Sequence, residues 1–291
     1  MEKRPYKERL KAMKLVLALF ITFIFINPAL AYHAAYDGLL STHVKQVQKD
    51  DILYNGVDYK GWAKDKRHQE AMKSLQAINP ENLETKNEKL AFWTNAYNLF
   101  TIDLITREEE EDSIKDLGSL ISTPWELHEW EISGKSYTLD QIEHEILRKM
   151  DEPRIHFALN CASKSCPDLR MESYKADRIV LQFDEQVNIF FENETKGLRT
   201  VKGENEVSIS KIMDWYEDDF NEGDITYLNS NNGWFINERI HYLYAISTHE
   251  LSLLSKFYWP IYLTFFPFRR MRKLNYNFDV MKNYDDSFRK L

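Results

Sequence analysis

One long segment is apolar around most of a helical axis, and it constrains the fold more than any other part of the chain. Residues 88–106 read EKLAFWTNAYNLFTIDLIT, with apolar side chains on every turn. This pattern predicts a helix buried on nearly all sides, which requires other elements packed around it. The 291-residue chain is 43% hydrophobic and 14% aromatic, enough to build that core. With short strand-like segments elsewhere, it predicts a single α+β domain of mixed helices and strands.

A narrow polar stripe interrupts this helix. Thr94, Asn98 and Thr101 share one face, and Asn95 lies at its edge. Buried amides must find hydrogen-bond partners. Asn95 and Asn98 therefore either bond neighbouring backbone groups, or orient a catalytic group or a ligand.

A second helix is predicted over residues 138–150, TLDQIEHEILRKM. Thr138 and Gln141 have the spacing of a capping box, in which each side chain bonds the backbone N–H of the other residue. This pair predicts that the helix begins at Thr138.

Glu143 falls on the apolar face of that helix, whereas His144 and Arg148 lie outside it. A carboxylate on an apolar face is costly unless it is paired. Two interpretations of Glu143 stay open: a structural salt bridge, to Arg154 or Arg148, and a catalytic role.

Residues 155–160 follow a proline and alternate like a largely buried strand. If the alternation continued, Cys161 and His156 would point to opposite faces, which makes His156 a poor base for Cys161. His144, from the preceding helix, would be freer to reach it. A bend before Cys161 would overturn this inference, and the segment CASKSCP favours turns.

Cys161 and Cys166 are the two cysteines of the chain, within RIHFALNCASKSCPDLR (154–170). A disulfide between them would close a loop of six residues, and loop entropy would then add only about 2 kcal/mol of stability. Nucleophilic catalysis is the second interpretation, with Cys161 attacking, His144 accepting its proton, and Glu143 or Asn95 supporting the site. Thiol redox chemistry is the third. The spacing matches no zinc site, so we expect neither a metal nor a cofactor.

The first 31 residues predict a secretory signal. A basic stretch precedes the apolar run LVLALFITFIFI, and Ala29-Leu30-Ala31 offers a cleavage site. The run is shorter than the roughly 20 residues that span a bilayer, which favours a cleaved signal over an uncleaved anchor. Either outcome predicts an exported protein, periplasmic or membrane-associated facing the periplasm, with one domain over 32–291.

The charge of the predicted mature chain argues against one class of partner. The whole chain carries −8, and the leader contributes +4 from six basic and two acidic residues, so −12 remains after residue 31. Because this excess repels phosphate backbones, we expect no nucleic acid partner.

An aromatic stretch lies near the end of the chain. Residues 257–268 are nearly all apolar or aromatic, and Arg269, Arg270, Arg272 and Lys273 follow them. This pattern suits contact with a membrane surface through 257–273, and core packing followed by a basic turn explains it equally well. The other partner, a substrate or a protein, is unknown.

Residues 209–220, ISKIMDWYEDDF, predict a short helix. Ser210 would cap it, and Ile212, Trp215, Tyr216 and Phe220 would face the core.

Four motifs together resemble the domain-of-unknown-function 547 family, over roughly residues 45–285. They are AFWTNAYNLFTI, LDQIEHEILR, RIHFALNCASKSCPDLR and ISKIMDWYEDDF. The resemblance implies an exported bacterial member, and relatives in nematodes and plants join the domain to other modules, including a glutaredoxin-like one. The family pattern implies functional positions at Asn95, Asn98, Glu143, His144, Arg148, His156 and Cys161, with Cys166 typical of the bacterial form.

The hypothesis is an exported α+β domain with a thiol-based site, resembling papain-like or transglutaminase-like enzymes. Cys161 would attack, His144 would take its proton, Glu143 would orient the histidine and Asn95 would support the oxyanion or the base. Asn98, Arg148, His156 and Cys166 would bind or support. The alternatives are a non-catalytic envelope binding or scaffold protein with a buried polar network, and a thiol redox protein.

Overall fold

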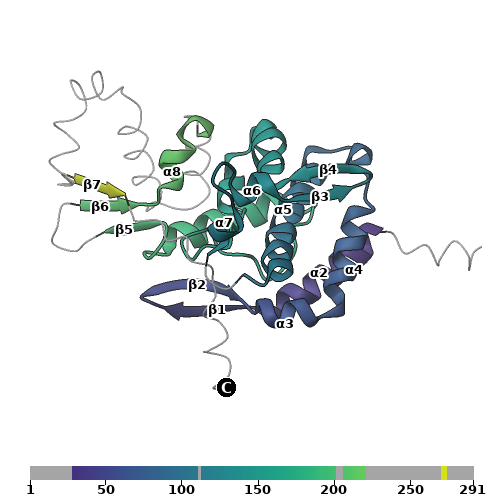
Figure 1. Ribbon diagram of the computed structural model, residues 1–291. Coiled ribbons are helices and arrows are strands. Elements are labelled where there is room, and N and C mark those ends of the chain that lie inside the picture. Colours follow the sequence, from purple (N-terminus) through teal and green to yellow (C-terminus); the bar gives the residue numbers. More distant parts are fainter. Residues whose placement is uncertain (1–27, 111–112, 201–205, 221–269, 274–291) are drawn as a thin grey trace, which may run out of the picture.

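Figure 1 shows a computed structural model of the protein, which describes residues 28–110, 113–200, 206–220 and 270–273. The described part is a mixed α+β domain, which confirms the predicted fold class. The helices are α2 (Pro28–His43), α3 (Tyr59–Lys64), α4 (Lys66–Gln76), η1 (Pro80–Asn82), α5 (Lys86–Glu108), η2 (Ile114–Leu117), α6 (Pro124–Leu127), η3 (Gln141–Leu147), η4 (Arg148–Met150), η5 (Pro153–Phe157), α7 (Ile179–Glu192), α8 (Ile212–Trp215) and η6 (Glu217–Asp219). The strands are β1 (Val44–Lys49), β2 (Ile52–Val57), β3 (Glu129–Ile132), β4 (Lys135–Thr138), β5 (Leu198–Thr200), β6 (Glu206–Ile209) and β7 (Arg270–Lys273).

Helix α5 is the buried helix that the sequence predicts over residues 88–106. A capping box starts it, because Thr85 Oγ1 accepts from the backbone of Glu88 while the Glu88 carboxylate accepts from the backbone of Thr85. All but one of the residues from Leu90 to Ile105 are buried. The helix ends where Glu109 takes a left-handed φ of 52°. Helices α3, α7 and η3 all contact α5, which is therefore the centre of the core (Figure 1).

The sheets are small. β1 pairs antiparallel with β2, and β3 with β4. Both hairpins turn through two residues with positive φ, Asp50 and Asp51 in the first and Ser133 and Gly134 in the second. Such turns match the twist of the paired strands and fix the register. In the third sheet β6 lies between β5, antiparallel to it, and β7, parallel to it.

The capping box predicted at Thr138 and Gln141 is present, with both side-chain to backbone hydrogen bonds at 3.1 Å. The helix that it starts is not α-helical throughout. Residues 141–147 form the π-helix η3, and the 3₁₀-helix η4 follows. π-Helical turns are rare and occur often at functional sites.

The strand predicted over residues 155–160 is wrong. Residues 153–157 form the 3₁₀-helix η5, with Pro153 in its first turn and the Glu152 carboxylate capping the backbone of Arg154. All residues from 153 to 160 are buried, so the alternation along this segment does not correspond to two faces. The orientation inferred from it for His156 therefore falls as well.

Two predicted regions lie mainly outside the described residues. Most of the leader does, and α2 includes its last four residues, 28–31. Of the predicted membrane-contact segment 257–273, only strand β7 is described. Within the part of the chain that the structure covers, no helix is both long and apolar enough to cross a bilayer.

Candidate functional site

The candidate site is a cavity of about 260 Å³. Its wall comes from α5, α6, η3, η5, α8 and the loop with both cysteines. Five of the predicted site residues line it: Glu143, His144, His156, Cys161 and Cys166. The fold therefore gathers in one place side chains that the sequence could only nominate separately.

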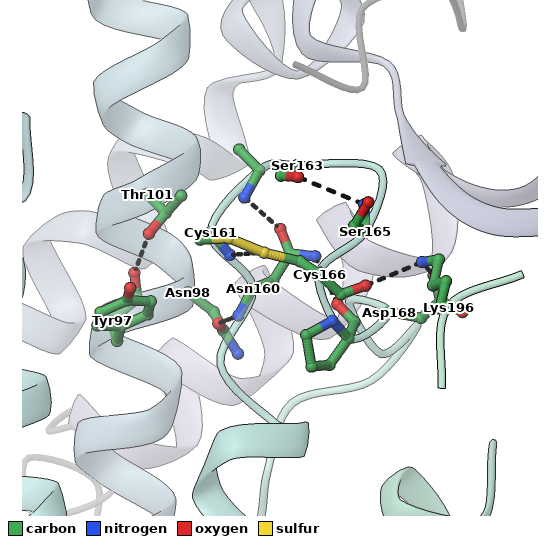
Figure 2. The surroundings of a disulfide bond; sticks show 12 residues. Tyr97, Asn98, Thr101, Asn160, Cys161, Ser163, Ser165, Cys166, Asp168 and Lys196 are labelled. Atoms are coloured by element: carbon green, nitrogen blue, oxygen red, sulfur yellow. Dashed lines mark hydrogen bonds and ion pairs between the residues drawn. A yellow bond between two sulfur atoms is a disulfide. The ribbon is translucent and has the colours of Figure 1, made fainter. Parts of the chain in front are cut away.

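Cys161 and Cys166 form a disulfide, the first of the three interpretations that the sequence left open (Figure 2). The backbone N–H of Cys161 also donates to Cys166 Sγ over 3.1 Å. Cys166 is only 1% exposed, whereas Cys161 keeps partial exposure at the cavity wall. Because the thiolate is the nucleophile, the chemistry predicted for Cys161 requires that this bond first be reduced.

Two asparagine side chains hold the backbone on either side of Cys161 (Figure 2). Asn98 accepts from the backbone of Asn160 and donates to the carbonyl of Ala158, at 2.8 and 3.0 Å. Asn160 in turn accepts from the backbone of Ala162 and donates to the carbonyl of Pro167. The bonds of Asn98 tie the start of the cysteine loop to helix α5, and the bonds of Asn160 connect the two ends of the loop.

A buried lysine anchors the other end of the loop. Lys196 Nζ donates to the carbonyl of Cys166 over 2.9 Å and pairs with Asp168 at 2.5 Å (Figure 2). The Lys196 side chain is 1% exposed. Burial lowers its pKa, while the charge of Asp168 acts in the opposite direction. The pair keeps the carbonyl side of Cys166 fixed.

Asn95 lies elsewhere. Its side chain donates to the carbonyl of Tyr174 and accepts from the backbone N–H of the same residue, both at 2.8 Å. Asn95 therefore joins α5 to the segment before α7 and is not part of the cavity wall.

His156 is held by an aspartate that sequence reasoning missed. Its Nε2 lies 2.7 Å from Asp219 Oδ2, and its ring stacks on Tyr216 with the centroids 3.8 Å apart. Burial lowers the pKa of His156, although the hydrogen bond to Asp219 acts in the opposite direction. Burial would raise the pKa of Asp219, but hydrogen bonds from Arg148 and His156 bring it below its ordinary value.

These states define the tautomer of His156. An ionised carboxylate only accepts hydrogen bonds, so the proton of the neutral imidazole lies on Nε2. The lone pair is then on Nδ1, the nitrogen that can accept a proton.

Arg148 connects this pair to His144. Its Nε and Nη2 donate to the two carboxylate oxygens of Asp219 at 2.6 and 2.8 Å, and its Nη1 lies 3.0 Å from His144 Nδ1. The guanidinium always donates, so His144 Nδ1 is the acceptor and its ring proton lies on Nε2. His144 Nε2 lies 3.6 Å from Asp140.

Glu143 is buried, as its position on the apolar face predicts, and its partner is a tyrosine. Tyr216 donates its hydroxyl to Glu143 Oε1 over 2.6 Å. The arginine partners considered from sequence bind elsewhere, Arg148 to Asp219 and Arg154 to Glu152 and Asp184. Tyr216 thus links Glu143 to the ring of His156.

The segment with Tyr216 and Asp219 differs from its prediction in one respect. Ser210 Oγ does accept from the backbone of Ile212 at the start of α8, and Phe220 is buried. Trp215, predicted to face the core, is 46% exposed because it lies at the cavity wall. The acidic run after Tyr216 was the only signal for Asp219, and it names no partner.

Within the part of the chain that the structure describes, no three His, Cys, Asp or Glu side chains are grouped so that they could hold an ion. The side chains with acid, base or nucleophilic chemistry that line the cavity are the imidazoles of His144 and His156, the carboxylates of Asp140 and Glu143 and, after reduction, the thiols of Cys161 and Cys166.

Comparison with known proteins supports the resemblance inferred from the motifs. Residues 80–191 match the family described as protein of unknown function, DUF547. The matched segment includes α5, η3, η5 and both cysteines, and ends in α7. No curated protein and no solved structure matches the chain.

Proposed function

We propose that this protein is an exported thiol-dependent hydrolase or acyl transferase, in which reduction of the Cys161–Cys166 disulfide releases Cys161 as the nucleophile. One observation carries the proposal. His156, oriented by Asp219, lines the same cavity as the more exposed cysteine. A nucleophile, a base and a carboxylate that orients the base are the groups that covalent acyl transfer requires.

The reaction would proceed in two steps. His156 Nδ1 takes the proton from the Cys161 thiol, and the thiolate adds to the carbonyl carbon of the substrate. The bond to the leaving group breaks, the leaving group takes the proton from His156, and a thioester remains on Cys161. Water or an amine then attacks this thioester, loses a proton through His156, and restores the thiol.

The contacts favour His156 over His144 as the base. The lone pair of His144 Nδ1 already accepts from Arg148, and its Nε2 carries a proton. Asp219 leaves Nδ1 of His156 as the basic nitrogen. Arg148 then acts as a positioning residue, because it holds both oxygens of Asp219.

Thiol redox chemistry is the second candidate, and the disulfide itself favours it. A partly exposed Cys161 and a buried Cys166 suit an exchange in which an external thiolate attacks Cys161 Sγ and Cys166 leaves as a thiolate. The hydrogen bond from the Cys161 backbone to Cys166 Sγ would stabilise that leaving thiolate. A second thiol then resolves the mixed disulfide, so that the external thiols become oxidised and the protein reduced.

The proposed export agrees with a resting state in which the two cysteines are oxidised. Disulfides persist outside the cytosol, and the leader has the basic and apolar parts of a secretory signal. We propose that the enzyme rests as the disulfide and is active where a thiol reductant is supplied.

Alkylation with iodoacetamide, followed by mass measurement, tests the nucleophile. The oxidised protein should take up no label. The reduced protein should gain one label quickly at Cys161 and a second slowly, because Cys166 is buried. The Cys166→Ser variant should label at Cys161 without a reductant. Labelling of Cys161 no faster than that of the denatured chain would reject a thiol enzyme and favour a scaffold.

The same variant separates the two candidate reactions. A hydrolase or acyl transferase needs only Cys161, so Cys166→Ser should form an acyl-enzyme with activated esters and turn it over. A redox protein needs both sulfurs, and the variant should stop at the mixed disulfide. His156→Gln should slow acylation more than His144→Gln, and the reverse order would return the base to His144.

A further inference from the structure

The cavity wall combines aromatic rings with acidic groups. Tyr97 comes from α5, Trp125 from α6 and Trp215 from α8. Trp215 is nearly half exposed, so its indole is accessible from solvent at the cavity. Aromatic faces carry negative potential and attract cations as well as apolar groups.

Two carboxylates line the same wall. Glu143 is 8% exposed, and its Oε1 accepts from Tyr216. The Asp140 side chain is 37% exposed, and its Oδ1 lies 3.6 Å from His144 Nε2. Both carboxylates come from the start of the helical segment after β4 and lie one turn apart.

Positive charge is scarce at this wall. None of the described residues that line the cavity is a lysine or an arginine. Arg148 lies close by, but both oxygens of Asp219 neutralise it. Burial keeps the pKa of His156 below its ordinary value, so that ring adds no charge at neutral pH. The wall therefore has an excess of negative charge.

A protein cation already occupies an environment of this kind beside the cavity. The Arg148 guanidinium lies 5.3 Å from the centroid of the Tyr216 ring, and its Nε donates to the carboxylate of Asp219. The Tyr216 ring and the Asp219 carboxylate thus hold a protein cation beside the cavity.

We propose that the cavity binds an organic ammonium ion attached to a short apolar chain. The aromatic rings would contact the chain and the N–CH₂ groups, and Asp140 and Glu143 would balance the charge. This deepens the proposed function and rests on it in one respect, because the bound amine would be part of the acyl donor or the acceptor that attacks the thioester. A substrate with a carboxylate at this position would be excluded by repulsion.

Binding is best measured in the full-length Cys161→Ser variant, which cannot form a thioester or the disulfide. Three probes of equal length, butylammonium, 1-butanol and butyrate, would be titrated while tryptophan fluorescence or heat is recorded. Butylammonium should bind at least about tenfold more tightly than 1-butanol, and butyrate should bind most weakly. Equal binding of the three probes would overturn the proposal.

Charge-neutral variants locate the binding groups. Asp140→Asn and Glu143→Gln should each weaken butylammonium binding by about three- to tenfold, with little effect on 1-butanol. Glu145→Gln is the matched control, because Glu145 is exposed on the same helix and does not line the cavity. Unchanged affinity in both Asp140→Asn and Glu143→Gln would overturn the proposal, and if one of them folds poorly, unchanged affinity in the other would do so.

The ammonium could come from a free amine or from a lysine side chain. A capped lysine dipeptide is the fourth probe: tighter binding than butylammonium supports a peptide-borne amine, equal binding supports a free amine, and binding of neither overturns the proposal. Because the binding is measured in Cys161→Ser, which has no thiol at position 161, the result does not depend on catalysis. Conversely, iodoacetamide is uncharged, so the alkylation experiment above tests the thiol alone.

Discussion

Oδ2 of Asp219 lies 2.7 Å from Nε2 of His156, although the two residues are 63 positions apart in the chain. The contact determines which nitrogen of the imidazole can accept a proton, and Arg148 fixes the carboxylate from the other side. The base of the proposed reaction is thus defined by a segment that is distant in sequence from both the histidine and the cysteine.

Replacing Asp219 tests this relationship. In Asp219→Asn the amide no longer holds the proton on Nε2 of His156, so the basic nitrogen is lost for part of the population. We expect the alkylation rate of Cys161 in the reduced protein to fall by up to about tenfold. Asp218→Asn is the control, because Asp218 is the exposed neighbour and should react like the parent. Equal rates in the two variants would remove Asp219 from the mechanism.

The rate should depend on pH in a defined direction. Burial holds the pKa of His156 below its ordinary value of 6.5. The neutral base therefore persists below pH 6.5, and activity should fall only as the pH drops through the lowered pKa. The pH profile of acylation by an activated ester checks this result. Activity that already falls while the pH is lowered toward 6.5 would contradict it.

Stability should follow the same group. The unfolded chain binds the proton of His156 at a higher pH than the folded protein does. The contribution of the neutral, buried imidazole is therefore complete above the unfolded pKa and is lost as pH falls through the folded pKa. Denaturant unfolding of the parent and of His156→Gln at several pH values measures it. The variant should show a smaller loss of stability between pH 7 and mildly acidic conditions.

The disulfide should add little stability for a bond of its kind. It joins residues five apart in the chain, so loop entropy contributes only about 2 kcal/mol. Reduction should lower the unfolding free energy by about that amount and leave the protein folded. Circular dichroism with and without reductant measures the change. Complete unfolding on reduction would assign the cysteines a structural role and weaken the case for a thiol enzyme.

Lys196 should matter much more for stability. Lys196→Met leaves Asp168 buried without its cation, and removing one partner of a buried pair costs about 3–5 kcal/mol. The change also frees the carbonyl of Cys166, so the disulfide should be reduced faster.

The matched control is Lys135→Met, which breaks an exposed pair with Glu81. Pairs of this kind contribute little in water, so its melting temperature should stay that of the parent. If Lys196→Met were equally mild, the anchoring role of the lysine would be wrong.

The sequence by itself determined the parts of this protein that depend on neighbouring residues. Helix α5 follows from an apolar pattern around its axis, and the capping box of Thr138 and Gln141 follows from two residues three positions apart. The burial of Glu143 follows from its place on an apolar face. Each of these signals involves residues close together in the sequence, so spacing and periodicity reveal it.

Tertiary structure decided the site. Residues 153–160 are buried on every side, so their alternation misled the assignment of a strand and the orientation of His156. The contacts of Asp219 with His156 and of Tyr216 with Glu143 span 63 and 73 residues. Local propensity holds no information about partners at such distances, because only the packing of α8 and η6 against the cavity brings their side chains to the histidine and the glutamate.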